Sequence, residues 1–101
     1  MPSLNLSVAH SLSQEEARER LQRFLEVVKS QYGDHVNNLE EEWNDEFVRF
    51  AFSAMGFSTS GKMTISHEEV VVDSKIPLAA MMFRGKIEST IREQLTRVLR
   101  S

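Results

Sequence analysis

The sequence predicts an α+β fold, β-α-β-β-β-β-α, in which an antiparallel sheet carries two helices packed on one face. Two segments repeat apolar residues at steps of three and four, as amphipathic helices do. Four consecutive segments between them, and one before the first helix, alternate apolar and polar residues, as strands do. Because each helix has a single apolar stripe to bury, both are expected to cover the same face of the sheet.

The composition limits the size of the fold and its setting. With 101 residues, 41% hydrophobic and 27% charged, residues 1–101 are expected to form a single domain around one core. The formal net charge of -3 argues against a general affinity for nucleic acid. Cysteine is absent, which excludes disulfides and is typical of a reducing compartment. With no apolar run of about 20 residues and no signal-peptide pattern, we expect a cytoplasmic protein without a membrane span.

The first strand and helix are predicted between residues 4 and 32. Alternation predicts a strand with a buried side formed by Leu4, Leu6 and Val8. Ser13 and Glu16 form a capping box, in which the hydroxyl accepts from the N–H of Glu16 and the carboxylate reaches back to Ser13. A helix is therefore predicted from Gln14 to Tyr32, ended by Gly33 in the left-handed conformation. Its apolar stripe comprises Ala17, Leu21, Phe24, Leu25, Val28 and Tyr32.

Two strands joined by a tight turn are predicted next. A loop at residues 35–38 leads to a strand whose inward side is formed by Leu39, Glu41 and Trp43. The acidic residues around it are expected to protect an exposed sheet edge from pairing with other chains. Asn44 and Asp45 favour a tight hairpin turn. The following strand is expected to be central, with an inward side formed by Val48, Phe50, Phe52 and Ala54.

The remaining elements are two strands and a helix. After a turn at Gly56, one strand has the inward set Phe57, Thr59, Gly61, Met63 and Ile65. Gly61 within it indicates a bulge or a close approach by a neighbouring element. The last strand has the inward set Val70, Val72, Ser74, Ile76 and Leu78, with pairing ended by Pro77. The final helical stripe is Phe83, Ile87, Ile91, Leu95, Val98 and Leu99. By analogy of architecture, this order is that of TBP-like folds.

An unbroken apolar joint connects the last strand to the last helix. We interpret it, together with the first basic residues of the helix, as an interaction surface formed by Ala79, Ala80, Met81, Met82, Phe83, Arg84 and Lys86. Methionine side chains adapt well to irregular apolar surfaces. The competing interpretation is that Met81, Met82 and Phe83 close the open end of the sheet beneath the helices.

The sequence predicts no catalytic residue, no metal ligand set and no cofactor. His10, His35 and His67 each fall in a predicted loop or turn, without the partner four residues away that a metal-binding helix provides. Glu68 and Glu69 follow His67 directly, but adjacent residues on a turn point apart. Ser13 is explained by its capping role, since no Gly-x-Ser-x-Gly motif surrounds it.

The outer face of the predicted sheet argues against a nucleic-acid interface. It is expected to carry charges of both signs, on Glu40, Glu42, Arg49, Ser53, Lys62, Thr64, Asp73 and Lys75. Sheets that bind nucleic acid instead interleave basic residues with stacking aromatic rings. Trp43 and Phe47 are too few for that pattern. The last helix is locally basic and is expected to attract acidic partners only weakly.

Two sequence features together resemble a known family. They are the joint from Ile76-Pro77-Leu78 to Phe83-Arg84-Gly85-Lys86-Ile87-Glu88, and His10-Ser11-Leu12 ahead of Glu16-Ala17-Arg18. Over about residues 10–99, the chain resembles the polyhydroxyalkanoic acid system family. The resemblance implies a small bacterial protein encoded near polyester-storage genes, in a family with no assigned catalytic residues. The chain departs from the family pattern at two places. A leucine-rich joint is usual where this chain has Ala79–Met82, and a turn that contains glycine is usual where it has Asn44-Asp45.

The sequence therefore predicts two alternative functions. The first is a non-enzymatic accessory or interaction protein of polyhydroxyalkanoate storage, which contacts granule proteins or the polyester granule surface through Ala79 to Phe83. The alternative is a small-ligand binding domain or minor enzyme, with a cleft between helices and sheet lined by Trp43, Phe50 and Phe52. A homodimer formed along an open sheet edge is compatible with either.

Overall fold

The computed structural model describes residues 3–54 and 56–100 and has the predicted order of elements. The elements are β1 (Ser3–Ala9), α1 (Gln14–Tyr32), β2 (Val36–Trp43), β3 (Phe47–Ala54), β4 (Phe57–Ile65), β5 (Glu69–Lys75), the 3-10 helix η1 (Leu78–Phe83) and α2 (Arg84–Val98). The predicted α+β class is confirmed, and α1 has the predicted bounds. The analogy with TBP-like folds stays a prediction.

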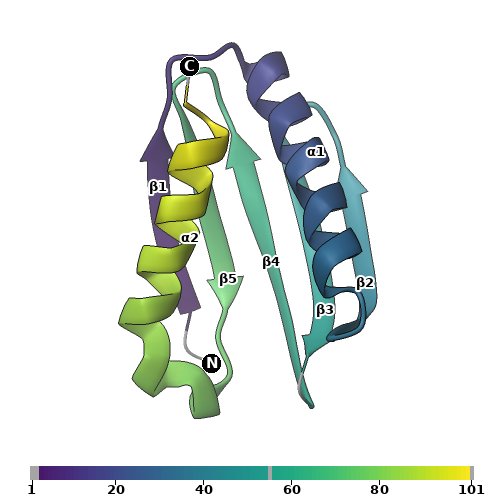
Figure 1. Cartoon of the computed structure of the whole chain (residues 1–101). Helices are drawn as coiled ribbons and strands as arrows, with labels where there is room; N and C mark the ends of the chain where they lie inside the picture. The colour runs from purple at the N-terminus through teal and green to yellow at the C-terminus, as the bar shows by residue number, and fades with distance from the viewer. Residues whose placement is uncertain (1–2, 55, 101) are drawn as a thin grey trace.

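The five strands form one antiparallel sheet in the order β1-β5-β4-β3-β2. Strands β2 to β5 follow one another as a meander, and β1 pairs with β5 at the far edge (Figure 1). The acidic strand β2 lies at the other edge, as predicted. The strand predicted to be central, β3, is paired on both sides, but β4 occupies the middle because β1 joins the sheet beside β5.

Directly opposed residues form rows across the sheet. Leu6 lies opposite Val72, Val72 opposite Met63, Met63 opposite Val48, and Val48 opposite Trp43. Opposed residues of an antiparallel pair share a face, so this row faces the helices as a unit. The predicted inward sets of these strands are therefore brought together by the register.

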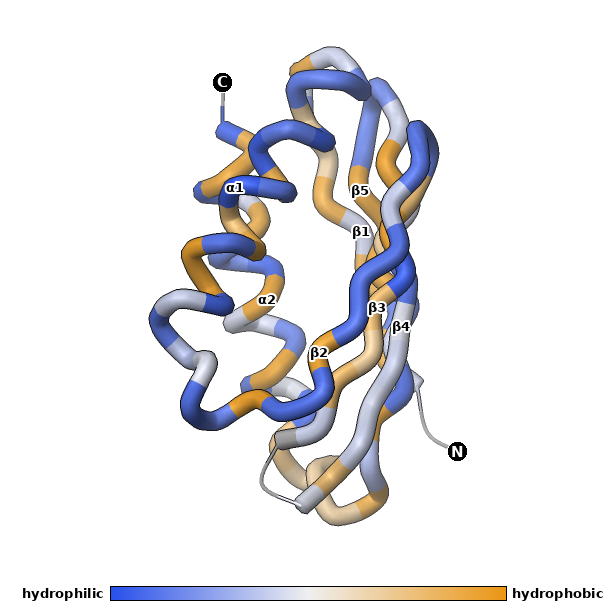
Figure 2. Tube along the Cα trace, turned by 90° about the vertical axis from the view of Figure 1, so that its right-hand side faces the viewer, coloured by the Kyte–Doolittle hydropathy of each residue, from blue (hydrophilic) through white to orange (hydrophobic). Residues whose placement is uncertain are grey.

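Both helices cover the same face of the sheet, as predicted (Figure 2). The Ser13 hydroxyl accepts a hydrogen bond from the backbone N–H of Glu16 at 3.1 Å and begins α1. The Glu16 carboxylate, predicted to reach back to Ser13, instead accepts from Nε of Arg20 at 3.0 Å.

The prediction for Gly33 at the end of α1 was wrong: its φ of -56° lies in the right-handed region. A Cβ there would lie 2.7 Å from the carbonyl oxygen of Lys29, so close approach explains the glycine.

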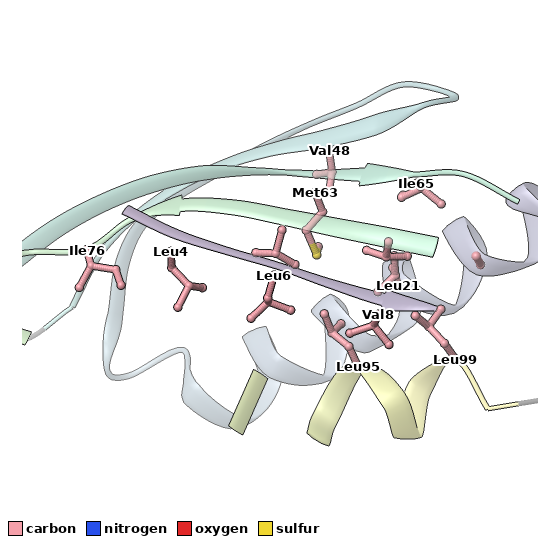
Figure 3. Packing of buried hydrophobic residues seen from close by; sticks show 13 residues of the cluster. Leu4, Leu6, Val8, Leu21, Val48, Met63, Ile65, Ile76, Leu95 and Leu99 are labelled. Atoms are coloured by element: carbon pink, nitrogen blue, oxygen red, sulfur yellow. The ribbon is translucent and has the colours of Figure 1, made fainter. Parts of the chain in front are cut away.

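The fully buried core lies mainly at one end of the molecule. Its residues are Leu4, Leu6, Val8, Ala17, Leu21, Val48, Met63, Ile65, Val70, Val72, Ile76, Leu95 and Leu99. Figure 3 shows Leu95 of α2 and Leu99, which caps its C-terminus, close to Val8 of β1. At this end Nη1 of Arg20 donates to the carbonyl oxygens of Val98 at 3.3 Å and Arg100 at 2.6 Å. The helices are thus tied together here and diverge toward the other end (Figure 1).

Three predicted features differ in the structure. Strand β2 begins at Val36, where a loop was predicted, because Asn38 takes a φ of 55° and a register shift between Asn37 and Glu40 keeps the strand paired. Leu78 was predicted to face inward, but β5 ends at Lys75 and Leu78 begins η1. Phe83, predicted to head the stripe of α2, ends η1 and is exposed.

Candidate functional site

The diverging helices leave an apolar groove of about 520 Å³ above the sheet. Helix α1 contributes Phe24, Leu25 and Val28 to one wall, and α2 contributes Ile91 and Leu95 to the other. The bottom is formed by strand side chains, among them Phe50, Phe52, Met63 and Val72. A groove of this size lies within the usual range of small-molecule sites. The predicted cleft between helices and sheet is therefore present.

The stripe of α1 divides between the core and the groove. Ala17 and Leu21 are fully buried, whereas Phe24, Leu25 and Val28 are half-buried and face the groove. Tyr32, at the end of the stripe, is exposed. Helix α1 diverges from α2 along its length, so the later side chains of its stripe line the groove and are only partly covered. Hydrocarbon surface is consequently left open to water at this end.

One row of the sheet places a glycine beside Phe50, whose ring lines the groove. The row runs from Leu4 through Ser74, Gly61 and Phe50 to Glu41. A Cβ on Gly61 would lie 2.7 Å from Cζ of Phe50, so the ring lies directly against the glycine backbone. This confirms the predicted close approach at Gly61.

A charged cluster borders the groove where α1 meets β2. Nζ of Lys29 lies 2.8 Å from Oε2 of Glu41 and 3.0 Å from Oε1 of Glu26. The indole Nε1 of Trp43 donates to Oε1 of Glu41 at 2.8 Å. Phe50 and Phe52 line the groove as predicted, but Trp43 does not: it lines a shallower polar hollow that shares Lys29 and Glu41 with the groove.

The two partners of this ion pair shift each other's pKa. Burial by itself would raise the pKa of Glu41, but hydrogen bonds from Lys29 and Trp43, with the charge of Lys29, lower it below its usual value of 4.5. Hydrogen bonds to Glu41 and Glu26 raise the pKa of Lys29 above 10.5. Both residues are therefore charged at neutral pH.

The Glu41→Gln variant is expected to lose stability mainly at neutral pH. Because the pKa of Glu41 is lowered in the folded state, its carboxylate stabilises the fold above pH 4.5 and loses this effect as the pH falls through the folded value. The difference in Tm between wild type and variant should therefore shrink as the pH drops below 4.5. Thermal unfolding followed by circular dichroism measures it. Glu40→Gln replaces the exposed neighbouring carboxylate, which is not an ion-pair partner of Lys29, and should lower the Tm less than Glu41→Gln at neutral pH; an equal loss would contradict the assignment.

The predicted interaction surface includes both exposed and partly buried side chains, and residues 79–83 of it belong to the 3-10 helix η1. Met82 is 82% exposed and Phe83 58% exposed, and Leu78, which sequence reasoning placed in the sheet, is 78% exposed. Ala80 and Met81 instead pack against the core, which agrees with the competing interpretation for Met81 but not for Met82 or Phe83. Pro77 immediately before Leu78 was the available signal that the strand had ended.

The other predicted members lie on the surface beside η1. Ala79 and Lys86 are exposed, and Nε of Arg84 lies 3.1 Å from Oε1 of Glu88 one helical turn away. The role of these residues in an interaction stays a prediction.

The histidines occupy separate positions. Nδ1 of His10 accepts from the backbone N–H of Leu12 at 3.0 Å, and its Nε2 lies 2.9 Å from the carbonyl oxygen of Ser66, so the ring joins two turns. His35 and His67 are exposed, and Nε2 of His67 lies 3.4 Å from Oε1 of Glu68. Within residues 3–54 and 56–100, no group of three acidic or histidine side chains has the arrangement to hold a metal ion. No helix in the same residues is long and apolar enough to cross a membrane.

The outer face of the sheet brings charges of opposite sign together. Lys62 lies directly opposite Asp73 on one side and Arg49 on the other. The cationic groups of Arg49 and Lys62 lie 5.0 Å and 4.8 Å from the centre of the Phe47 ring. The aromatic face is thus occupied by the protein's own cations. The absence of a nucleic-acid partner stays a prediction.

Fold and groove together define a small α+β domain with an apolar groove and a separate exposed apolar turn. The chain belongs to the family described as "Putative polyhydroxyalkanoic acid system protein", which matches residues 4–99. A comparison with curated proteins finds no match. Among solved structures, TTHA0849 from Thermus thermophilus is 15% identical, with a TM-score of 0.38 over 97% of this chain and 94% of that one. A similarity this low supports no statement about function.

Proposed function

We propose that this protein is a non-enzymatic accessory protein of polyhydroxyalkanoate storage that attaches to the surface of the polyester granule through η1. The observation that carries the proposal is the concentration of exposed apolar side chains on one short segment, Leu78, Met82 and Phe83. Clustered apolar exposure of this kind is typical of interaction sites. The family name supports polyester storage as the setting.

The residues next to η1 suit a boundary between an apolar surface and water. Arg84 and Lys86 are exposed at the start of α2, directly after the apolar segment. Long cationic side chains lay their hydrocarbon stems along apolar surfaces and keep their charges in water. In this arrangement Leu78, Met82 and Phe83 enter the granule surface and the cations remain at its edge.

The double variant Leu78→Glu, Met82→Glu is expected to lose granule binding. Full burial of one Leu or Met side chain contributes about 1.5–3 kcal/mol, so the loss of two should weaken binding by more than about tenfold. The measurement is co-sedimentation of the purified protein with polyhydroxyalkanoate particles. Met81 is left unchanged because it packs against the core.

A matched control places the same charges on other exposed apolar residues. Val27 is 51% and Tyr32 52% exposed on α1, and the double variant Val27→Glu, Tyr32→Glu should sediment as wild type does. Circular dichroism verifies that both variants fold. Sedimentation of the Leu78, Met82 variant at the wild-type level would refute attachment through η1.

A second candidate function is the binding of a small ligand in the groove. The specific observation in its favour is the groove itself, with its apolar walls on both helices. It is separate from η1, since none of the described residues that line it belongs to that segment. The two functions are therefore testable by separate substitutions.

A further inference from the structure

We propose that the groove between the helices binds the hydrocarbon chain of an uncharged hydroxyalkanoate ester. The identity of the ligand rests on the proposed role in polyester storage. The inference that the ligand is apolar and uncharged rests on the groove alone.

The apolar character follows from the residues at the bottom and sides. Phe24, Leu25 and Val28 on α1 face Ile91 on α2 across the space, and all four are only half-buried. The rings of Phe50 and Phe52 lie beneath them with centroids 6.4 Å apart. A hydrocarbon chain lying between these side chains removes apolar surface from water on both partners, which is the main favourable contribution in such sites.

The absence of charge on the ligand follows from the Lys29 cluster. Lys29 is the one cation among the described residues that line the groove, and it lies 2.8 Å from Glu41 and 3.0 Å from Glu26. One positive charge between two negative ones leaves this border net negative. A ligand carboxylate placed here would be repelled, and Lys29 is already hydrogen-bonded to both acidic partners. The site therefore disfavours a free fatty acid relative to its ester.

The α2 wall supplies hydrogen-bonding groups that suit an ester. Thr90 and Gln94 lie one helical turn apart, and both line the groove. Neither side chain forms a hydrogen bond with any residue in the described part of the chain. Their hydroxyl and amide groups are free to donate to the carbonyl or hydroxyl oxygen of a hydroxyalkanoate ester. A plain hydrocarbon would leave these donors unused.

The first test compares two tryptophan substitutions at consecutive positions. Val28→Trp fills the groove, whereas Val27→Trp places the same side chain on the exposed side of α1, where Val27 is 51% exposed. Binding of methyl hydroxyoctanoate to the full chain is measured by titration calorimetry or protein NMR. We expect Val28→Trp to weaken binding by about tenfold or more and Val27→Trp to leave it unchanged. Thermal unfolding shows that each variant is folded.

The second test addresses charge. Hydroxyoctanoate, which is the anion of the same acid at neutral pH, should bind wild type more weakly than the methyl ester does. Glu41→Gln removes one negative charge beside Lys29 and should strengthen hydroxyoctanoate binding relative to ester binding. Hydroxyoctanoate binding as tight as that of the ester in wild type, or an anion-to-ester ratio unaffected by Glu41→Gln, would overturn the assignment of an uncharged ligand.

The outcomes separate this inference from the proposed function. Failure of wild type to bind the ester, or equal binding by the two tryptophan variants, overturns the groove assignment even when co-sedimentation with granules persists. The Leu78→Glu, Met82→Glu variant should retain ester binding, so its loss of sedimentation concerns η1 alone. Light scattering tests a second copy as the occupant: a wild-type dimer that Val28→Trp converts to a monomer would overturn the inference.

Discussion

Replacement of Leu21 by Ala should lower the free energy of unfolding by about 2–5 kcal/mol, the range observed for buried leucines. Leu21 is 0% exposed and is, with Ala17, one of the two fully buried residues of α1. The substitution removes hydrocarbon at the end where both helices meet the sheet, and the cavity it leaves cannot be filled by Ala17. The free energy of unfolding of such a domain is about 5–15 kcal/mol in total, so this substitution removes a large part of its stability.

Urea unfolding followed by circular dichroism measures this loss directly. The matched control is Val27→Ala on the same helix, where the side chain is 51% exposed and the effect should lie within about 0.5 kcal/mol. A Leu21→Ala variant as stable as the control would mean that α1 is not held to the sheet through this residue.

Replacement of Gly61 by Ala should lower the free energy of unfolding by about 1–3 kcal/mol through overpacking. An added Cβ would lie 2.6 Å from the carbonyl oxygen of Asp73, 2.7 Å from Cζ of Phe50 and 3.0 Å from Cα of Ser74. Two of these neighbours are backbone atoms of β5, which cannot move without disturbing the sheet. The Phe50 ring must shift as well, and it forms part of the groove.

The control for Gly61 is the same substitution at Gly85. Nothing lies within 4 Å of a Cβ built at Gly85, which is exposed on α2. Alanine is favoured over glycine within a helix by about 1 kcal/mol at most, so Gly85→Ala should be neutral or stabilising. Opposite signs for the two variants in urea unfolding support close packing at Gly61; a stabilising effect at Gly61 would refute it.

The two ends of the molecule thus differ in how the helices pack on the sheet. At the closed end, Leu21, Leu95 and Leu99 hold both helices on the sheet, and the Arg20 guanidinium joins α1 to the end of α2. At the open end, the helices separate and leave Phe24, Leu25 and Val28 of α1 half-buried along the groove. Leu21 and Leu99 belong to the core without lining the groove, whereas Phe24 and Val28 line the groove outside the core, so substitutions at these residues can alter stability and the proposed binding site separately.

Local patterns in the sequence were sufficient to predict the individual elements. The capping serine and the apolar steps gave α1 its predicted bounds, and alternation identified the inward sides of the strands. These signals depend on neighbouring residues only, through backbone geometry and the period of the side chains. The shortest segments were less predictable: η1 was missed because the apolar run from Leu78 to Phe83 has no period that separates a strand end from a helical turn.

The sequence by itself determined which side of each element is apolar and where most elements begin and end. Only the tertiary structure decided that Leu21 is core while Val28 lines a groove, that Phe50 lies against Gly61, and that Trp43 binds Glu41 instead of lining the cleft. The physical reason is that periodicity specifies the direction of a side chain, whereas its burial depends on what a distant segment places opposite it.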